Sequence, residues 1–267
     1  VAAAPIAAPT ISAPVVPVPK KPGSFSVGVF LGYAGGSSLG SDAERQAAAT
    51  CGANCPMING GLVGARMAYR EGAIFSVELS GGYLGLTSAF QRDVADKFGA
   101  AEEYDVTYRL HQKISLSGPF AGLGVSARFP FAQRFAVVGR FAIAGLSADV
   151  SNAMSGDAMA TRSTAALVVG QEQPMVRTAS LLVAPEVTME ATFGGVVLGA
   201  GLGVFVSTLP GASFGERRLL PINPALCTQA AESSAACAPE SGVTSGERSN
   251  GAFAVFVPQI SARYQFN

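Results

Sequence analysis

The sequence predicts an all-β protein that crosses a membrane as an antiparallel up-and-down β-barrel of eight strands. Composition is the first observation: the 267 residues are 49% apolar but only 13% charged, about half the charge of an average soluble domain. The second is that the apolar residues alternate with polar or small ones, which is the period of a β-strand. The third is that long and short connections alternate along the chain, as in membrane barrels.

The last predicted strand shows the alternation most clearly. It runs from Ala252 to Phe266, longer than the roughly 9–11 residues with which a strand crosses a bilayer. Its outward row is Ala252, Ala254, Phe256, Pro258, Ile260, Ala262, Tyr264 and Phe266, and its inward row is Val257, Gln259, Ser261, Arg263 and Gln265. The ending Tyr264-Gln265-Phe266 resembles the C-terminal signal of bacterial outer-membrane β-barrel proteins, although Asn267 follows the Phe.

The other strands follow from the same alternation. In chain order, the eight predicted strands lie at about residues 25–33, 62–69, 75–83, 106–129, 134–146, 176–191, 191–206 and 252–266. Aromatic residues near the strand ends suit the interfacial girdles of a membrane barrel. The predicted girdle residues are Phe25, Tyr33, Tyr69, Tyr83, Phe129, Tyr264 and Phe266.

The fourth strand changes phase along its length. Tyr108, Leu110, Ile114 and Leu116 share one parity, whereas the apolar residues from position 121 to 129 share the other. One extra residue in a strand exchanges its two faces. We therefore expect a β-bulge around Gly118-Pro119.

The segment 191–206 also has the GxxxG spacing of a transmembrane helix, through Gly195, Gly199 and Gly203. Glycine is a poor helix former, and every neighbouring segment has period two. The strand is the favoured interpretation.

The predicted connections are short near Glu71, Pro130 and Phe193. Long loops are predicted at about residues 34–61, 85–105, 147–175 and 207–250. Membrane barrels carry long loops on the extracellular side and short turns on the periplasmic side, so an even strand number places both termini in the periplasm. Ten strands would need another hairpin in the last loop, where alternation is lacking. A soluble β-sandwich would need polar outer faces.

This layout, over about residues 25–266, resembles the small eight-stranded outer-membrane barrels of the OmpA and OmpX type. The resemblance is one of architecture, and it implies a place in the Gram-negative cell envelope. That family includes anchors, adhesins, closed pores and enzymes, so the fold does not fix the function.

Residues 1–23 are predicted to be a separate Ala/Pro-rich periplasmic segment, and residues 24–267 the barrel. The segment lacks the basic start and unbroken apolar run of a signal peptide. Its prolines favour an extended polyproline-type conformation. It is either a disordered tail or a strap that docks on a periplasmic or outer-membrane protein.

Charged residues of inward parity are the main candidate site. They are Arg66, Glu78, Arg140, Glu186, Glu190 and Arg263. We expect Arg66 to pair with Glu78 and Arg140 with Glu186, and Arg70, Arg128 and Arg134 to lie near the periplasmic mouth. An eight-stranded barrel has room for little more than its own side chains. The charges form either a static salt-bridge core or, as the OmpA-type resemblance suggests, a gate.

Four cysteines, Cys51, Cys55, Cys227 and Cys237, lie in the first and last predicted loops. An even number in an exported chain predicts disulfides, with three connectivities open. No metal-ligand spacing surrounds them, so neither a metal nor a cofactor is expected.

These features predict a non-enzymatic structural or interaction barrel, for anchoring, assembly or adhesion. The alternative is a narrow gated channel for water, ions or small solutes. The single histidine, His111, has no catalytic pattern around it, and we assign no catalytic residue. Equal numbers of basic and acidic residues, 18 each, argue against nucleic acid. The expected partners are outer-membrane lipid, lipopolysaccharide and a protein bound through residues 1–23.

Overall fold

The structure is a computed structural model, and it describes residues 23–50, 55–72, 74–98, 104–160, 167–207, 220–221 and 251–266. Apart from Gly23, the predicted N-terminal segment 1–23 lies outside these residues. So do Cys51, Cys227 and Cys237.

Eight long antiparallel strands close into a ring, which confirms the predicted fold class. In ring order they are β1 (Ser24–Gly36), β2 (Met57–Glu71), β3 (Phe75–Phe98), β4 (Tyr104–Pro130), β5 (Phe135–Ala160), β6 (Leu167–Phe193), β7 (Val196–Ser207) and β9 (Phe253–Phe266). β9 pairs with β1 and closes the ring. The two-residue strand β8 (Leu220–Pro221) pairs with β6.

Three short connections join strands at one end of the barrel, near Glu71, Pro130 and Phe193 as predicted. Gly72 and Gly194 adopt positive φ angles of 76° and 62°, the left-handed region that glycine enters without steric cost. We call this end the turn end.

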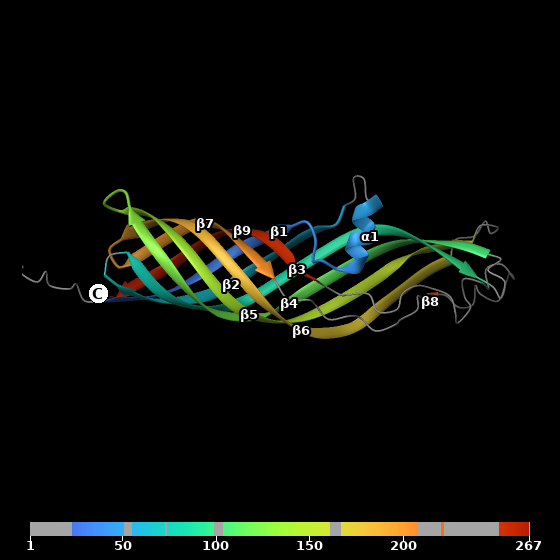
Figure 1. The fold of residues 1–267 in the computed structure, drawn as a ribbon, viewed down its shortest axis with the longest axis horizontal. Helices are drawn as coiled ribbons and strands as arrows, with labels where there is room; N and C mark the ends of the chain where they lie inside the picture. The colour runs from blue at the N-terminus through green and yellow to red at the C-terminus, as the bar shows by residue number, and fades with distance from the viewer. Residues whose placement is uncertain are drawn as a thin grey trace, which may run out of the picture.

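The barrel wall has two heights. β3 to β6 contain 24 to 27 residues each, whereas β1, β2, β7 and β9 contain 12 to 15. Figure 1 shows β3 to β6 continuing past the other strands at the end away from the turns. The predicted long loops 85–105 and 147–175 are therefore wrong, since most of their residues are strand. Most of the predicted loop 207–250 lies outside the described residues.

The predicted bulge in β4 is also wrong. The registers of β4 with β3 and with β5 are constant along its length, and the one recorded register shift lies between β5 and β6 at Val150/Asn152. Tyr108, Leu110, Ile114 and Leu116 are buried inside the barrel. The same row of β4 residues faces the barrel interior along the whole strand. What changes is the chemistry of the two faces: the apolar residues lie on the inner face at one end of the strand and on the outer face at the other.

This exchange divides the barrel into two sections. The membrane section, next to the turns, has large exposed apolar residues outside and charged or small residues inside. The projecting section has mostly polar residues outside. Inside it has an apolar core that also contains buried polar side chains such as Arg92, Gln112 and Asn152. The outer face changes between Tyr83 and Thr87 on β3, between Ala121 and Ser117 on β4, between Gly145 and Asp149 on β5, and between Leu181 and Arg177 on β6. The barrel spans the membrane with the first of these sections.

One helix, α1 (Asp42–Thr50), packs against β3 beside the projecting section (Figure 1). Its start is a capping box: the Glu44 backbone N–H donates to Ser41 Oγ, and the Ser41 N–H donates to the Glu44 carboxylate, both at 3.1 Å. Leu39, Ala43 and Ala47 join the barrel's apolar core. Within the described part of the chain, no helix is long and apolar enough to cross a membrane.

Candidate functional site: the charged lumen

The six predicted lumen charges lie inside the membrane section and form one network. Arg66 comes from β2, Glu78 from β3, Arg140 from β5, Glu186 and Glu190 from β6, and Arg263 from β9. Strand alternation turns these positions inward, and the small residues around them leave room for long side chains. Five strands thus contribute to a single cluster.

Arg140 is the centre of the network. Its Nε lies 3.3 Å from Glu78 Oε1, its Nη1 2.7 Å from Glu186 Oε1 and its Nη2 2.5 Å from Glu190 Oε1. Nη1 also donates to Thr188 Oγ1 at 2.9 Å. One guanidinium therefore neutralises parts of three carboxylates, which is what its fork of five N–H donors permits.

Arg66 connects opposite walls of the barrel. Its Nε lies 3.4 Å from Glu78 Oε2 on the neighbouring strand, and its Nη2 donates to Glu186 Oε2 at 2.8 Å from across the lumen. Both predicted pairs are thus in contact, but each is one part of a shared network. The similar distance of these residues from the turns on neighbouring strands suggested the two pairs. The contact of Arg66 with Glu186 across the lumen depends on barrel closure.

Glu190 forms ion pairs with the arginines nearest the turn end. Its Oε2 lies 2.5 Å from Arg263 Nη2 and 3.5 Å from Arg128 Nε, while its Oε1 binds Arg140. Arg70 shares this region but has no recorded ion pair with a described residue. Arg134, which we expected near the mouth, lies exposed in the turn before β5.

An aromatic layer closes the lumen on the side of the charges that faces away from the turn end. The ring of Phe120 lies 6.4 Å from that of Phe30 and 6.3 Å from that of Phe205. The Phe30 ring also faces Arg66 Cζ at 4.9 Å, a cation–π distance. These three inward phenylalanines were not among the lumen residues predicted from the sequence. The signal was available, because each has the parity of the lumen row on its strand.

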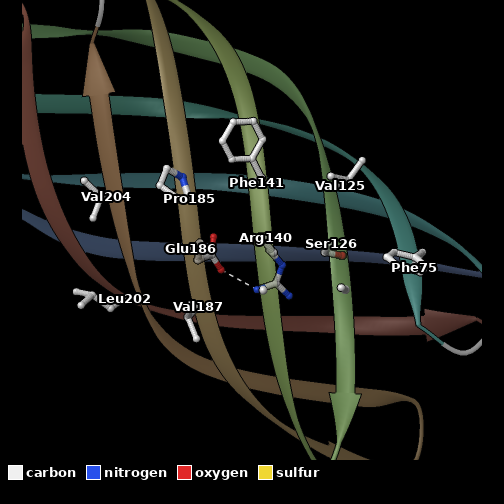
Figure 2. Close-up of a pocket in the computed structure, with 12 residues that line it drawn as sticks. Phe75, Val125, Ser126, Arg140, Phe141, Pro185, Glu186, Val187, Leu202 and Val204 are labelled. Carbon is white, nitrogen blue, oxygen red and sulfur yellow. Dashed lines mark hydrogen bonds and ion pairs between the residues drawn. The ribbon is translucent and has the colours of Figure 1, made fainter.

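The described side chains leave little space in the lumen around Arg66 and Arg140. Two cavities beside Arg66 and Arg140 measure about 20 and 30 Å³, and one water needs about 10–15 Å³. A larger hollow of about 570 Å³ lies against β4 to β7 and is lined mainly by lipid-facing side chains such as Val125, Phe141 and Val187. Figure 2 shows these apolar residues around the linked pair Arg140 and Glu186.

The remaining predicted residues lie apart from this network. All seven girdle aromatics are exposed on the outer face; Phe25 and Phe266 pack with ring centroids 6.1 Å apart, and Tyr264 and Phe266 with centroids 4.9 Å apart. Cys55 is disulfide-bonded. The disulfides of Cys51, Cys227 and Cys237 stay a prediction, with the three connectivities open. Exposed His111 shares a 3.1 Å hydrogen bond with Gln91. The described residues hold no cluster of potential metal ligands.

The closed ring, the apolar outer band and the polar lumen define the class: an eight-stranded membrane β-barrel, the architecture that the OmpA/OmpX resemblance implied. No protein-family model and no curated protein sequence matches the chain. Among solved structures, Ail, the attachment invasion locus protein of Yersinia pestis, aligns with a TM-score of 0.37 and 8% identity, covering 91% of this chain and 99% of Ail. The outer membrane protease OmpT of Escherichia coli aligns with a TM-score of 0.26 and 10% identity, covering 91% of this chain and 96% of OmpT.

Proposed function

We propose that this protein is a non-enzymatic structural or interaction barrel of the bacterial outer membrane, acting in anchoring, assembly or adhesion. The observation that carries the proposal is the filled interior. The alternative, a narrow gated channel, needs a continuous polar path for water or ions.

Three layers of side chains fill the barrel interior one after another, and they favour a closed barrel. The charge network centred on Arg140 occupies the lumen near the turns. Phe30, Phe120 and Phe205 lie above it, and an apolar core follows in the projecting section, with residues such as Leu116 and Val150 fully buried. Moving an ion through such a core has a high desolvation cost.

The outer wall of the projecting section is the surface best suited to a partner. It is polar and carries exposed ion pairs between neighbouring strands: Arg109 Nε lies 3.7 Å from Asp93 Oδ1, and Arg177 Nε 3.1 Å from Asp149 Oδ1. Exposed pairs of this kind add little to stability. Their side chains are therefore available to a hydrophilic partner.

The orientation follows from the two ends of the barrel. Outer-membrane barrels have short periplasmic turns and larger extracellular parts. We accordingly place the turn end and both chain termini in the periplasm, and the projecting section outside the cell. Residues 1–23 and the disulfide-tied loops would then be contact surfaces on opposite sides, with lipid and lipopolysaccharide around the membrane section.

Conductance distinguishes an interaction barrel from a channel. The purified protein, inserted in a planar bilayer, is expected to be electrically silent. Phe120→Ala, which removes the central ring of the aromatic layer, should give brief openings, whereas Phe141→Ala on the lipid-facing side should not. Steady conductance by the wild-type protein would contradict the closed-barrel proposal.

Co-purification tests the interaction role itself. The protein would be extracted from native outer membrane in gentle detergent, with and without residues 1–23. A stoichiometric partner that is lost with the segment supports an anchoring or assembly role. A clean monomer in both preparations counts against a partner bound through this segment.

A further inference from the structure

We propose that the turn end of the lumen binds an oxyanion of the phosphate class between Arg70 and Arg128. This site does not depend on whether the barrel anchors, adheres or conducts. It follows from the charge balance and the unused donors of the lumen.

The described lumen of the membrane section carries more positive than negative charge. Its arginines are Arg66, Arg70, Arg128, Arg140 and Arg263, and its carboxylates are Glu78, Glu186 and Glu190. Five guanidiniums thus share three carboxylates. An uncompensated charge in a barrel interior is costly, so the two surplus positive charges favour an added anion.

The surplus is concentrated at the turn end. Glu78 and Glu186 are occupied by Arg66 and Arg140, farther from the turns. Both oxygens of Glu190 are also engaged, by Arg140 and Arg263. Arg128 keeps only a 3.5 Å contact with Glu190, and Arg70 has no recorded ion pair among the described residues.

Unused hydrogen-bond donors mark the same place. The Nε atoms of Arg70, Arg128 and Arg263 are buried and have no hydrogen-bond partner. Arg128 uses Nη2 to donate to Thr192 Oγ1 at 3.0 Å, which fixes its guanidinium near the wall. Arg70 and Arg128 carry like charges, so they repel each other at this end of the lumen.

Arg70 and Arg128 are suitably spaced for a shared ligand. Register places Arg70 opposite Ser76 on β3, and Ser76 opposite Ser126 on β4, so Arg128 is two strands away and two residues along. At about 4.8 Å per strand and 3.3 Å per residue, their Cα atoms are roughly 12 Å apart. Two arginine side chains can span that distance around one tetrahedral anion.

Among the described residues at the turn end, no carboxylate other than Glu190 faces the lumen. Glu71, at the β2–β3 turn, is exposed on the outer face. Residues 1–23 contain two lysines and no Asp or Glu. Phosphate oxygens suit the planar guanidinium fork, which binds them with paired hydrogen bonds.

Two sources can supply this chemistry: free inorganic phosphate, or the phosphate of a lipid headgroup at the adjacent membrane surface. Thermal unfolding of the full chain in a neutral detergent would be followed in phosphate and in chloride of equal ionic strength. A second arm uses detergent with phosphatidic acid or with an uncharged diacylglycerol. Stabilisation by phosphate indicates the free ion, and stabilisation by phosphatidic acid alone indicates the headgroup.

Arg70→Gln removes the guanidinium without breaking a recorded ion pair. In chloride this variant should be at least as stable as wild type, because a repulsion is relieved, and it should bind the stabilising phosphate about tenfold more weakly. Arg177→Gln, which breaks an exposed pair on the projecting section, should bind phosphate as wild type does. Equal stabilisation of wild type and Arg70→Gln, or no stabilisation in either arm, would overturn the proposal.

Discussion

Arg140 Nη2 donates to Glu190 Oε1 at 2.5 Å, and both side chains are almost completely buried, with 4% and 2% of their surfaces exposed. In register, Glu190 lies opposite Ala136, four residues from Arg140. The bond is therefore a long diagonal along the inner wall. Through Arg140 it links Glu190, the carboxylate nearest the turns, to Glu78 and Glu186, which Arg140 also contacts.

Arg140→Met should be the most damaging single change in the lumen. It removes the guanidinium that contacts Glu78, Glu186 and Glu190, and removing one member of a buried pair costs about 3–5 kcal/mol. Urea unfolding of the barrel refolded in lipid vesicles measures this loss. Arg177→Met, in an exposed pair with Asp149, is the control and should cost about 1 kcal/mol or less. Similar losses for the two variants would show that the network does not hold the membrane section together.

Loss of the capping box should loosen α1 without affecting the barrel. The Glu44 carboxylate is fully buried and accepts hydrogen bonds from the Leu39 N–H, the Ser41 N–H and two serine hydroxyls. Ser41→Ala should destabilise the helix by about 1 kcal/mol, and Glu44→Ala by more. Hydrogen exchange of the α1 amides reports the effect. Asp42→Asn, on the exposed side of the same turn, should change exchange much less; equal effects would argue against the cap.

Strong curvature makes some inward glycines irreplaceable. A Cβ on Gly60 would lie 2.0 Å from the backbone oxygen of Gly85, whereas a Cβ on lipid-facing Gly139 would meet nothing within 4 Å. Gly60→Ala should therefore lower the free energy of unfolding by roughly 1–3 kcal/mol, and Gly139→Ala should be neutral. Urea unfolding of both variants in vesicles is the test. A Gly60→Ala barrel as stable as wild type would mean that β2 and β3 are farther apart than described.

The sequence predicted the strand order and the lipid-facing rows because strand alternation is local. Phe75, Val77 and Leu79 are exposed where their parity placed them. It failed where the environment changes along one strand. Leu110 and Leu116 alternate as Leu123 and Val125 do, but the first two face an apolar core and the last two face lipid. Alternation identifies the two faces of a strand, but it does not show whether each face contacts water, lipid or the protein core.

The candidate site was predictable as a set of residues but less so as a network. Inward parity identified Arg66, Glu78, Arg140, Glu186, Glu190 and Arg263. Neighbouring strands suggested two pairs, and the contact of Arg66 with Glu186 required the curvature of the closed ring. The closing layer of Phe30, Phe120 and Phe205 was not predicted, because these residues share their inward parity with the charges and parity does not separate an apolar layer of the lumen from a polar one.

The two-section barrel is the central claim, and tryptophan fluorescence tests it most directly. The natural chain contains no tryptophan, so each single-tryptophan variant reports one site. In vesicles of brominated lipid, which quench tryptophan on contact, Leu123→Trp in the outer face of the membrane section should be strongly quenched. Lys113→Trp, on the outer face of the projecting section, and Leu110→Trp, in its core, should keep their fluorescence, with Leu110→Trp emitting at shorter wavelength. Strong quenching of Leu110→Trp would contradict the account, because it would turn this face of β4 toward lipid.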